Sequence, residues 1–316
     1  MSAPPAAGKR VEWHSVPASV AASIEQVIGS PVVEARTRVG GFSPGVAARL
    51  LCADGTRWFV KAVSSEANPD TPGIHRREAE NLRALDSFAA ARNLPIARLR
   101  GVVEQDPWIA LVLDDVDGHT PAVPWLADEL ARVLAAVDVI GEALTPAPIA
   151  APDVVEVFGD ELTGWRTLAL AGGDDRLDRW SRDRCEELAE LEATWTAHAA
   201  GETLLHTDLR ADNVLLTSDG VVVVDWPYAC RGAAFIDVVF LAPSVAMQGG
   251  PELSELLAMT RAGRAVDKQA LTATVCALAG YFTQRSLTPP PAGIPTVRAF
   301  QAAQGEITRR WLAALL

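Results

Sequence analysis

Short extended runs dominate the first third of the chain, and longer helical patterns dominate the rest. Between residues 31 and 63, apolar and β-branched residues are interrupted by glycines and prolines, and Asp54-Gly55 is a typical type I′ hairpin pair. This segment therefore predicts three strands. The apolar spacing over residues 74–92 predicts a helix.

Two more strands are expected at residues 95–105 and 107–115, and much of 125–200 is helical in pattern. Strands first and helices later predict an α+β fold with two lobes. The expected boundaries are a loose Pro/Ala-rich tail at 1–10, an N-terminal lobe at 11–113, a hinge at 114–118 and a helical C-terminal lobe at 119–316.

Composition narrows the class of protein. The apolar fraction of 49% fits a globular chain, and the formal charge of −12 argues against a nucleic-acid partner. The four cysteines lie far apart without CxxC spacing, so neither a disulfide framework nor a zinc site is indicated. No signal segment or membrane-spanning run is present in the sequence. We therefore expect a cytoplasmic protein without a membrane partner.

Lys61 is the first residue whose type needs an explanation. The chain has 25 arginines and only three lysines, yet WFVKAV places one of these lysines inside an apolar strand. Since arginine is the usual cation in this chain, a lysine at this position indicates that a compact ammonium makes a specific contact there. The alternative is a lysine at the sheet margin whose side chain extends to water.

A carboxylate lies on the apolar face of the helix expected after this strand. At about 100° per residue, Glu78 shares a stripe with Leu82 and Leu85. Glu80 points to the opposite side. Burying an unpaired charge is costly, so we expect Glu78 to pair with Lys61. A glutamate in the first helical turn, where acids are common, is the alternative.

GGFSPG at residues 40–45 joins two of the expected strands. Glycines there allow backbone N–H groups to approach an anion closely. Pro44 has no N–H, so a phosphate contact in this loop would use Phe42, Ser43 and Gly45. The alternative is an ordinary hairpin turn, which is commonly rich in Gly and Pro and needs no ligand.

HTDLRADN at residues 206–213 contains Asp208 and Asn213, and Asp225 follows twelve residues later at the end of VVVV. Two separated oxygen ligands suit Mg²⁺, which proteins commonly hold with one or two carboxylates plus substrate phosphates. Asp208 would then meet a substrate hydroxyl. With Lys61 available for phosphates, these residues predict a phosphoryl-transfer site.

Several motifs, taken in order, resemble the aminoglycoside phosphotransferase family of the protein-kinase-like superfamily. They are VKAV at Lys61, RREAE at Glu78, LVLDDVDG at 111–118, HTDLRADN, VDW and GAAFID ending at Asp237. The resemblance implies a bilobal kinase-like fold, with a nucleotide-binding N-terminal lobe. It implies ATP and Mg²⁺ as cofactors, a small-molecule hydroxyl as acceptor, a role such as antibiotic resistance, and a monomer or homodimer.

The resemblance also implies the roles of the matching residues. Asp208 stands at the catalytic base position, and Asn213 and Asp225 stand at the Mg²⁺ ligand positions. Lys61, held by Glu78, would contact the α- and β-phosphates. His206 corresponds to the loop histidine that supports the catalytic aspartate. By this resemblance His206 does not itself act as an acid or a base.

Two further contacts follow from the same likeness. The adenine would meet the backbone C=O of Asp114 and the N–H of Val116, although a buried strand followed by an acidic turn would have the same sequence. Arg210 follows Asp208 by two, where protein kinases often have a lysine. It is a candidate γ-phosphate contact, with a surface salt bridge as the alternative.

The chain departs from the family pattern at three points. Thr207 stands where small-molecule kinases commonly have glycine, and Asp225-Trp226-Pro227 lacks the glycine of the protein-kinase motif. Only twelve positions separate Asp225 from Asp237. This interval leaves no room for a switched activation segment, which favours a small acceptor over a protein serine.

The sequence does not identify the acceptor molecule. Residues 153–192 hold twelve acids against five arginines, in the region where the family shapes its substrate cleft. An acidic wall there would attract a polycationic aminoglycoside. A solvated helix face in an acidic protein is the alternative.

Two other function classes account for parts of the pattern. A nucleotide-binding pseudokinase would act as a scaffold without turnover, but the complete set of kinase-like residues argues against it. A metal hydrolase would use His206, Asp208 and Asp212, but it leaves Lys61 without a role, and the other histidines have no metal-ligand spacing.

Overall fold

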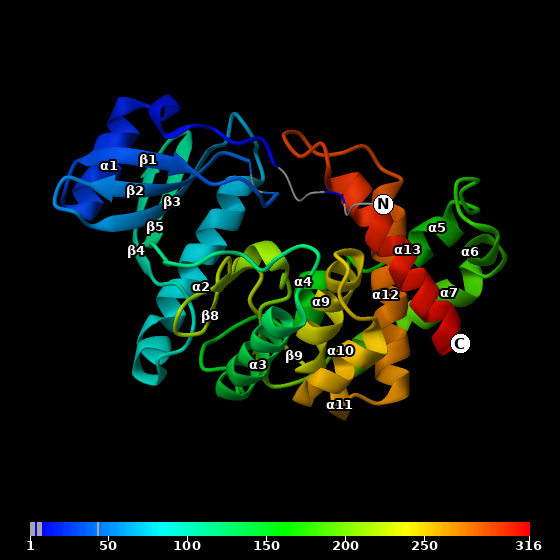
Figure 1. Cartoon of the computed structure of the whole chain (residues 1–316). Coiled ribbons are helices and arrows are strands. Elements are labelled where there is room, and N and C mark those ends of the chain that lie inside the picture. The colour runs from blue at the N-terminus through cyan, green and yellow to red at the C-terminus, as the bar shows by residue number, and fades with distance from the viewer. Residues whose placement is uncertain (1–3, 5–7, 43) are drawn as a thin grey trace.

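A five-stranded antiparallel sheet forms the N-terminal part of the protein, and helices form most of the rest (Figure 1). The computed structural model describes residue 4, residues 8–42 and residues 44–316. This is the α+β architecture that the sequence predicts. The strands, in the order β1-β2-β3-β5-β4, are β1 (Val32–Thr37), β2 (Val46–Cys52), β3 (Arg57–Ser64), β4 (Leu99–Gln105) and β5 (Trp108–Asp114).

The alternation of side chains along β3 and β5 gives the sheet two different faces. Val60 and Val112 belong to one buried cluster, which packs against α1 (Ala18–Ile28). Leu111 belongs to the main core on the other face, where α2 (Thr71–Arg92) lies. Lys61 pairs with Leu111 in the register of the two strands and shares its face. The sequence pattern had not indicated α1, whereas α2 begins three residues before the predicted helix.

The β2–β3 hairpin forms where it was predicted, but its turn differs from the prediction. A type I′ turn needs positive φ at both central residues, and here Gly55 has φ 82° while Asp54 has no positive φ. The carboxylate of Asp54 accepts hydrogen bonds from the N–H of Thr56 at 2.9 Å and from its hydroxyl at 2.7 Å. The N–H of Gly55 also donates to the carbonyl of Cys52 at 2.9 Å, so the Asp54 side chain supports a longer hairpin turn that keeps its backbone hydrogen bond.

Two small antiparallel sheets hold the ends of the loops that carry the candidate chemistry. Residues 206–213 connect β6 to β7, and residues 224–229 connect β8 to β9. Since β6 pairs with β9 and β7 pairs with β8, the two loops are fixed side by side. The strands are β6 (Thr203–Leu205), β7 (Val214–Leu216), β8 (Val221–Val223) and β9 (Cys230–Gly232).

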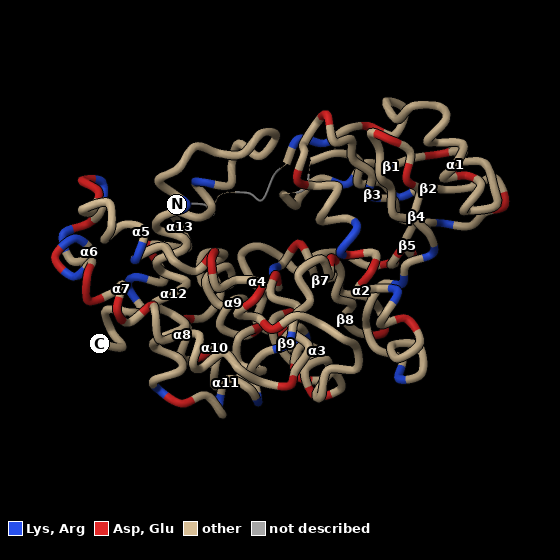
Figure 2. The backbone as a smooth tube through the Cα atoms, turned by 180° about the vertical axis from the view of Figure 1, so that it is seen from behind, with Lys and Arg blue, Asp and Glu red and all other residues tan. Residues whose placement is uncertain are grey.

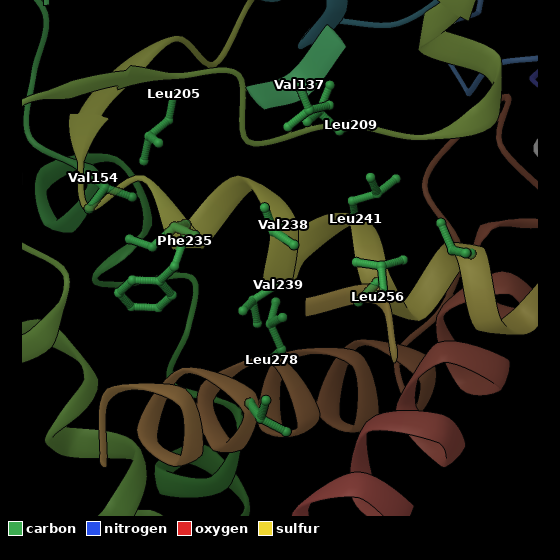
Figure 3. Close-up of a cluster of buried hydrophobic side chains, with 14 of the residues drawn as sticks. Val137, Val154, Leu205, Leu209, Phe235, Val238, Val239, Leu241, Leu256 and Leu278 are labelled. Carbon is green, nitrogen blue, oxygen red and sulfur yellow. The ribbon is translucent and has the colours of Figure 1, made fainter. Parts of the chain in front are cut away.

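Helices pack around these sheets and form the main core. Figure 3 shows Val239 of α9 facing Leu278 of α12, with Leu209 of the 206–213 loop on the opposite side of α9, where Leu241 lies. Burial of Leu209 therefore anchors the residue between Asp208 and Arg210. The helices are α3 (Ala127–Ala143), α4 (Val154–Phe158), α5 (Gly164–Leu170), α6 (Arg179–Asp183), α7 (Cys185–Ala193), α8 (Trp195–His198), α9 (Phe235–Met247), α10 (Leu253–Met259), α11 (Arg261–Ala265), α12 (Lys268–Ser286) and α13 (Val297–Leu315), with single 3₁₀ turns η1 (Trp13–Ser15) and η2 (Ala211–Asn213).

The start of the chain is held in place earlier than the sequence predicts. The N–H of Gly8 donates to Gly41 at 2.8 Å, and the N–H of Lys9 donates to Gly293 at 2.8 Å. Residues 8–10 therefore connect the loop before β2 with the segment that precedes α13. Among the described residues, no helix combines the length and apolar character needed to cross a bilayer.

Candidate active site

A cavity of about 1080 Å³ lies between the sheet and the helical part of the chain. Its lining includes Lys61, Glu78, Asp208, Asn213 and Asp225. Residues that are far apart in the sequence are thus brought to one space.

The Lys61 ammonium joins both sides of this cavity. Its Nζ donates to Oε1 and Oε2 of Glu78, at 2.7 and 2.9 Å, and to Oδ1 of Asp225 at 2.9 Å. The predicted contact between Lys61 and Glu78 is therefore present. Glu78 is 1% exposed, which excludes the alternative of a solvated first-turn glutamate.

Burial and charge oppose one another in this trio. Burial alone would lower the pKa of Lys61, but the carboxylates of Asp225 and Glu78 outweigh it and raise that pKa. Burial raises the pKa of Glu78, and Lys61 opposes the shift. Burial would raise the pKa of Asp225, but the Lys61 ammonium outweighs the effect of burial and keeps this pKa below the ordinary value. Lys61 is consequently charged throughout the physiological range.

The 206–213 loop is shaped by a buried carboxylate. Asp237 accepts hydrogen bonds from the N–H of His206 at 2.9 Å and from that of Thr207 at 2.7 Å. Thr207 has φ 64°, a left-handed conformation that glycine adopts more easily than threonine. Its hydroxyl donates to the carbonyls of His206 and Tyr228, at 2.7 and 3.1 Å.

His206 positions the loop and has no nitrogen left for a metal. The N–H of Asp208 donates to its Nδ1 at 3.2 Å, which leaves Nε2 to donate to the carbonyl of Val224 at 3.0 Å. Burial lowers the pKa of the imidazole. Among the described residues, no three His, Cys, Asp or Glu side chains form a metal-binding group. The metal-hydrolase alternative therefore has no ligand set.

Asp208 is a partly buried acid held by two donors. The guanidinium of Arg210 contacts its Oδ1 at 2.5 Å, and the amide of Asn213 donates to its Oδ2 at 3.1 Å. Burial raises the pKa of Asp208 to about 6, although Arg210 opposes the shift. A carboxyl with this pKa is mostly ionised at neutral pH and accepts a proton more readily than an exposed aspartate.

Arg210 lies inside the cavity. Its side chain is 16% exposed and also binds Asp212, with Nε–Oδ1 at 3.0 Å. Its guanidinium lies over the ring of Phe42, 5.4 Å from the centroid. This burial argues against the plain surface salt bridge. The link to Phe42 joins the 206–213 loop to the loop before β2.

The oxygen atoms expected to face a cation suit Mg²⁺. The amide nitrogen of Asn213 is directed to the carbonyl and carboxylate of Asp208, at 2.8 and 3.1 Å, so its amide oxygen remains for a ligand. Asp225 has φ 70°, a strained conformation for a non-glycine residue. Hard oxygen donors from two loops are the chemistry that Mg²⁺ prefers.

The glycine-rich loop differs from the expected phosphate cradle. Ser43 lies outside the described residues. The N–H of Gly45 donates to the carbonyl of Lys9 at 3.1 Å, so in this structure it is directed to the chain start. A Cβ at Gly45 would lie 2.4 Å from the carbonyl oxygen of Ala62. Close approach to β3 therefore accounts for this glycine. Phe42 packs edge-on against Phe300, 5.0 Å between centroids.

The expected adenine contacts lie at the end of β5. Asp114 and Val116 both line the cavity. Arg49 donates to the carbonyl of Val116, and the carboxylate of Asp114 binds Arg100 at 2.6 Å. The side chains thus hold the segment in place, and its backbone borders the cavity.

Two residues beside the Lys61 trio have no signal in the sequence pattern. Arg10 donates to the carbonyl of Gly40; burial lowers its pKa, and the charges of Asp225 and Asp212 oppose that shift. His75 is 3% exposed, and burial lowers its pKa to about 3, so its imidazole is neutral. Arg10 reaches the site through chain-start pairing that no local pattern predicts.

The acid-rich stretch from 153 to 192 does not form a wall of the cavity. Of its twelve acids, only Glu161 is among the described residues of the lining. Glu192 is buried elsewhere and accepts the N–H groups of Trp165 and Arg166, at 2.9 and 3.0 Å. Figure 2 shows the acids around α6 and α7 at the end of the molecule away from the sheet. Those positions correspond to the alternative of solvated helix faces.

A family model identifies the class of protein as a kinase-type phosphotransferase. The chain belongs to the phosphotransferase enzyme family, whose model matches residues 35–270. No curated protein matches the chain in sequence.

Solved structures share the fold. An aminoglycoside phosphotransferase from Alicyclobacillus acidocaldarius is 18% identical, with a TM-score of 0.56, and the match covers 90% of this chain and 91% of that one. A choline kinase from Streptococcus pneumoniae is 11% identical, with a TM-score of 0.59, covering 94% and 98%. An amicoumacin kinase in complex with AMP-PNP and Ca²⁺ is 11% identical, with a TM-score of 0.58, covering 92% and 93%.

Proposed function

We propose that this protein transfers the γ-phosphoryl group of ATP, bound with Mg²⁺, to a hydroxyl group of a small molecule. The observation that carries the proposal is the Lys61 ammonium between Glu78 and Asp225, with the partly buried Asp208 in the same cavity. A fixed cation, two loops with oxygen ligands and a separate acid are the parts that phosphoryl transfer requires.

Each residue has one role in this proposal. Lys61, fixed by Glu78, binds the α- and β-phosphates. Asn213 and Asp225 hold Mg²⁺, which neutralises phosphate charge when bound. Asp208 accepts the proton of the acceptor hydroxyl as that oxygen forms a bond to the γ-phosphorus. The bond from the γ-phosphorus to the bridging oxygen breaks, and ADP leaves.

Three further contacts complete the assignment. Arg210 is placed beside Asp208, where it would stabilise charge on the transferred group. The backbone of Asp114 and Val116 would bind adenine at the edge of the cavity. Ser43 and Gly45 belong to the loop over the phosphates, and the N–H of Gly45 would have to leave Lys9 to contact them.

The fold relatives support the cofactors and the acceptor class. One solved relative is in complex with an ATP analogue and a divalent cation, and the printed names of others include an aminoglycoside phosphotransferase and a choline kinase. All three names describe chemistry on small molecules. Resistance, biosynthesis and metabolism are each compatible roles for such an enzyme in the cytoplasm.

Thermal unfolding with nucleotide and metal tests this function. Because a ligand that binds only the native state stabilises it by about 2.7 kcal/mol at a hundredfold excess over Kd, ATP with Mg²⁺ should raise Tm. Lys61→Met should lose the shift, and the exposed Lys268→Met should keep it. A panel of sugar, aminoglycoside, macrolide and metabolite alcohols, read by ADP release and product mass, then identifies acceptors.

Three outcomes would contradict the proposal in different ways. No shift with any nucleotide or metal argues against a kinase. A shift without ADP release on any alcohol indicates a pseudokinase. Turnover of protein substrates with none of small alcohols contradicts a small-molecule acceptor.

A further inference from the structure

One part of the cavity lining is rich in aromatic side chains. We call it the acceptor pocket; it is formed by side chains from α9, α12, α13 and the segments around α4, together with Tyr228 of the 224–229 loop. Its aromatic members are Phe158, Tyr228, Phe240, Tyr281, Phe282 and Phe300. The α12 and α13 residues of this pocket lie beyond residue 270, where the family match ends, so family membership does not define them.

Two phenols of the acceptor pocket feel the charge of Asp208. Burial raises the pKa of Tyr228 to about 12, the charge of Asp208 adds to the shift, and Arg77 opposes it. Burial likewise raises the pKa of Tyr281, which lies within the electrostatic range of Asp208, Arg285 and Arg298. Arg285 also lies over the ring of Tyr281, 5.7 Å from its centroid.

The fixed charge of the acceptor pocket is positive. Arg285 of α12 and Arg298 of α13 line it, and Glu161 is the one acid among the described lining residues from α9, α12, α13 and the segments around α4. Glu161 is already bound by Arg285. Arg77 lies over the ring of Tyr228, 5.8 Å from its centroid, and takes part in no ion pair among the described residues. A polycation would therefore meet like charges here.

Arg298 is the cation best placed to bind an anion. Its guanidinium donates to the carbonyl of Pro289, at 3.1 and 2.9 Å, and to the amide oxygen of Gln301 at 2.7 Å. All these partners are neutral, so its charge is not compensated by a carboxylate. Burial and the charge of Arg285 both lower its pKa, because both disfavour an uncompensated cation. A ligand carboxylate would remove this penalty.

We propose that the acceptor is a hydroxyl compound with an aromatic or apolar body and a carboxylate, which Arg298 binds while the rings of Tyr281 and Phe300 hold the body. The proposal rests on the phosphotransferase function above and assigns its substrate class. It excludes polycationic aminoglycosides as the preferred acceptor.

Three phenyl glycosides that differ at one group test the charge preference. They are phenyl β-D-glucuronide, phenyl β-D-glucoside and the matching amino sugar in which an aminomethyl group replaces the carboxylate. Binding is measured by calorimetry with AMP-PNP and Mg²⁺, and turnover by ADP release and product mass. We expect the glucuronide to bind roughly tenfold or more tightly than the glucoside, since bonds to charged groups are the stronger class. The amino sugar should bind most weakly.

Variants assign the preference to one side chain. Arg298→Gln should remove the preference for the glucuronide, and Arg298→Lys should retain part of it, because the charge remains without the bidentate geometry. Arg310→Gln is the matched control on the same helix, since Arg310 is paired with Glu252 at the surface. It should keep the full preference.

The acceptor class is overturned if the amino sugar or kanamycin binds as well as the glucuronide. It is also overturned if none of the three glycosides binds, or if Arg298→Gln keeps the preference. Titration with ATP and Mg²⁺ in the same calorimeter separates the two proposals. If the unaltered protein does not bind ATP with Mg²⁺, the phosphotransferase function is contradicted. If it binds the nucleotide but does not prefer the anionic glycoside, only the acceptor class is contradicted.

Discussion

Lys61 and Asp225, 164 positions apart, are joined by a hydrogen bond of 2.9 Å across the cavity. One belongs to the central strand β3 and the other to the loop after β8, so this contact ties the sheet to the helical part. A nucleotide bound as proposed would place its phosphates and cation between them. The pair thus marks the space where the phosphates would lie.

Replacement of Lys61 should destabilise the fold in a pH-dependent way. Lys61→Met leaves Glu78 buried without its partner, so the free energy of unfolding should fall by about 3 kcal/mol at pH 8. Burial raises the pKa of Glu78, and a carboxyl whose folded pKa exceeds its unfolded value binds more protons when folded. Stability therefore falls as pH rises, and the loss should be smaller near pH 5. Urea unfolding at both pH values measures it.

A matched control separates the buried pair from a general effect of lysine removal. Lys268→Met, at an exposed position, should change stability little. The double variant Lys61→Met with Glu78→Leu should recover much of the loss, since an apolar pair replaces an unpaired charge. Equal losses at both pH values would contradict a buried, uncompensated Glu78.

Activity should fall on the acid side because Asp208 must be ionised. Burial raises its pKa to about 6, so kcat/KM should fall roughly tenfold per pH unit below that value. Removing the Arg210 charge takes away an effect that lowers this pKa. Arg210→Gln should therefore move the acid limb to higher pH, and Arg310→Gln should not. A limb that stays in place in Arg210→Gln would show that another group titrates.

The sequence predicts a site residue correctly where the local repeat of a strand or helix determines the direction of its side chain. Strand alternation and helix angle place Lys61 and Glu78 correctly, because each periodicity fixes a side-chain direction. Arg10 depends on pairing with residues 30 positions later, and no local pattern carries that information. The acids of 153–192 were ambiguous for the same reason: composition does not tell which face of a short helix meets the cavity.

Two glycines in helices should respond in opposite ways to alanine. A Cβ on Gly164, at the start of α5, would lie 2.0 Å from the carbonyl oxygen of Gly280 in α12. Gly164→Ala should therefore destabilise the protein by roughly 2 kcal/mol or more, because two helix backbones must separate. Gly141 in α3 has nothing within 4 Å of such a Cβ. Gly141→Ala should stabilise it by up to about 1 kcal/mol. Urea unfolding of both variants checks the signs, and similar effects would contradict the close α5–α12 crossing.

The most direct measurement of the proposed site is calorimetric titration of ATP with Mg²⁺ into Asp208→Asn and Asp225→Asn, paired with turnover of an identified acceptor. Each change removes one charge at nearly constant volume. Asp208→Asn should bind ATP with Mg²⁺ almost normally while kcat falls roughly 10² to 10⁴-fold, because only a positioned proton acceptor is lost. Asp225→Asn should weaken nucleotide binding as well as turnover, because it removes a proposed metal ligand. Loss of ATP binding in Asp208→Asn, with normal binding in Asp225→Asn, would contradict the proposed roles of the two acids.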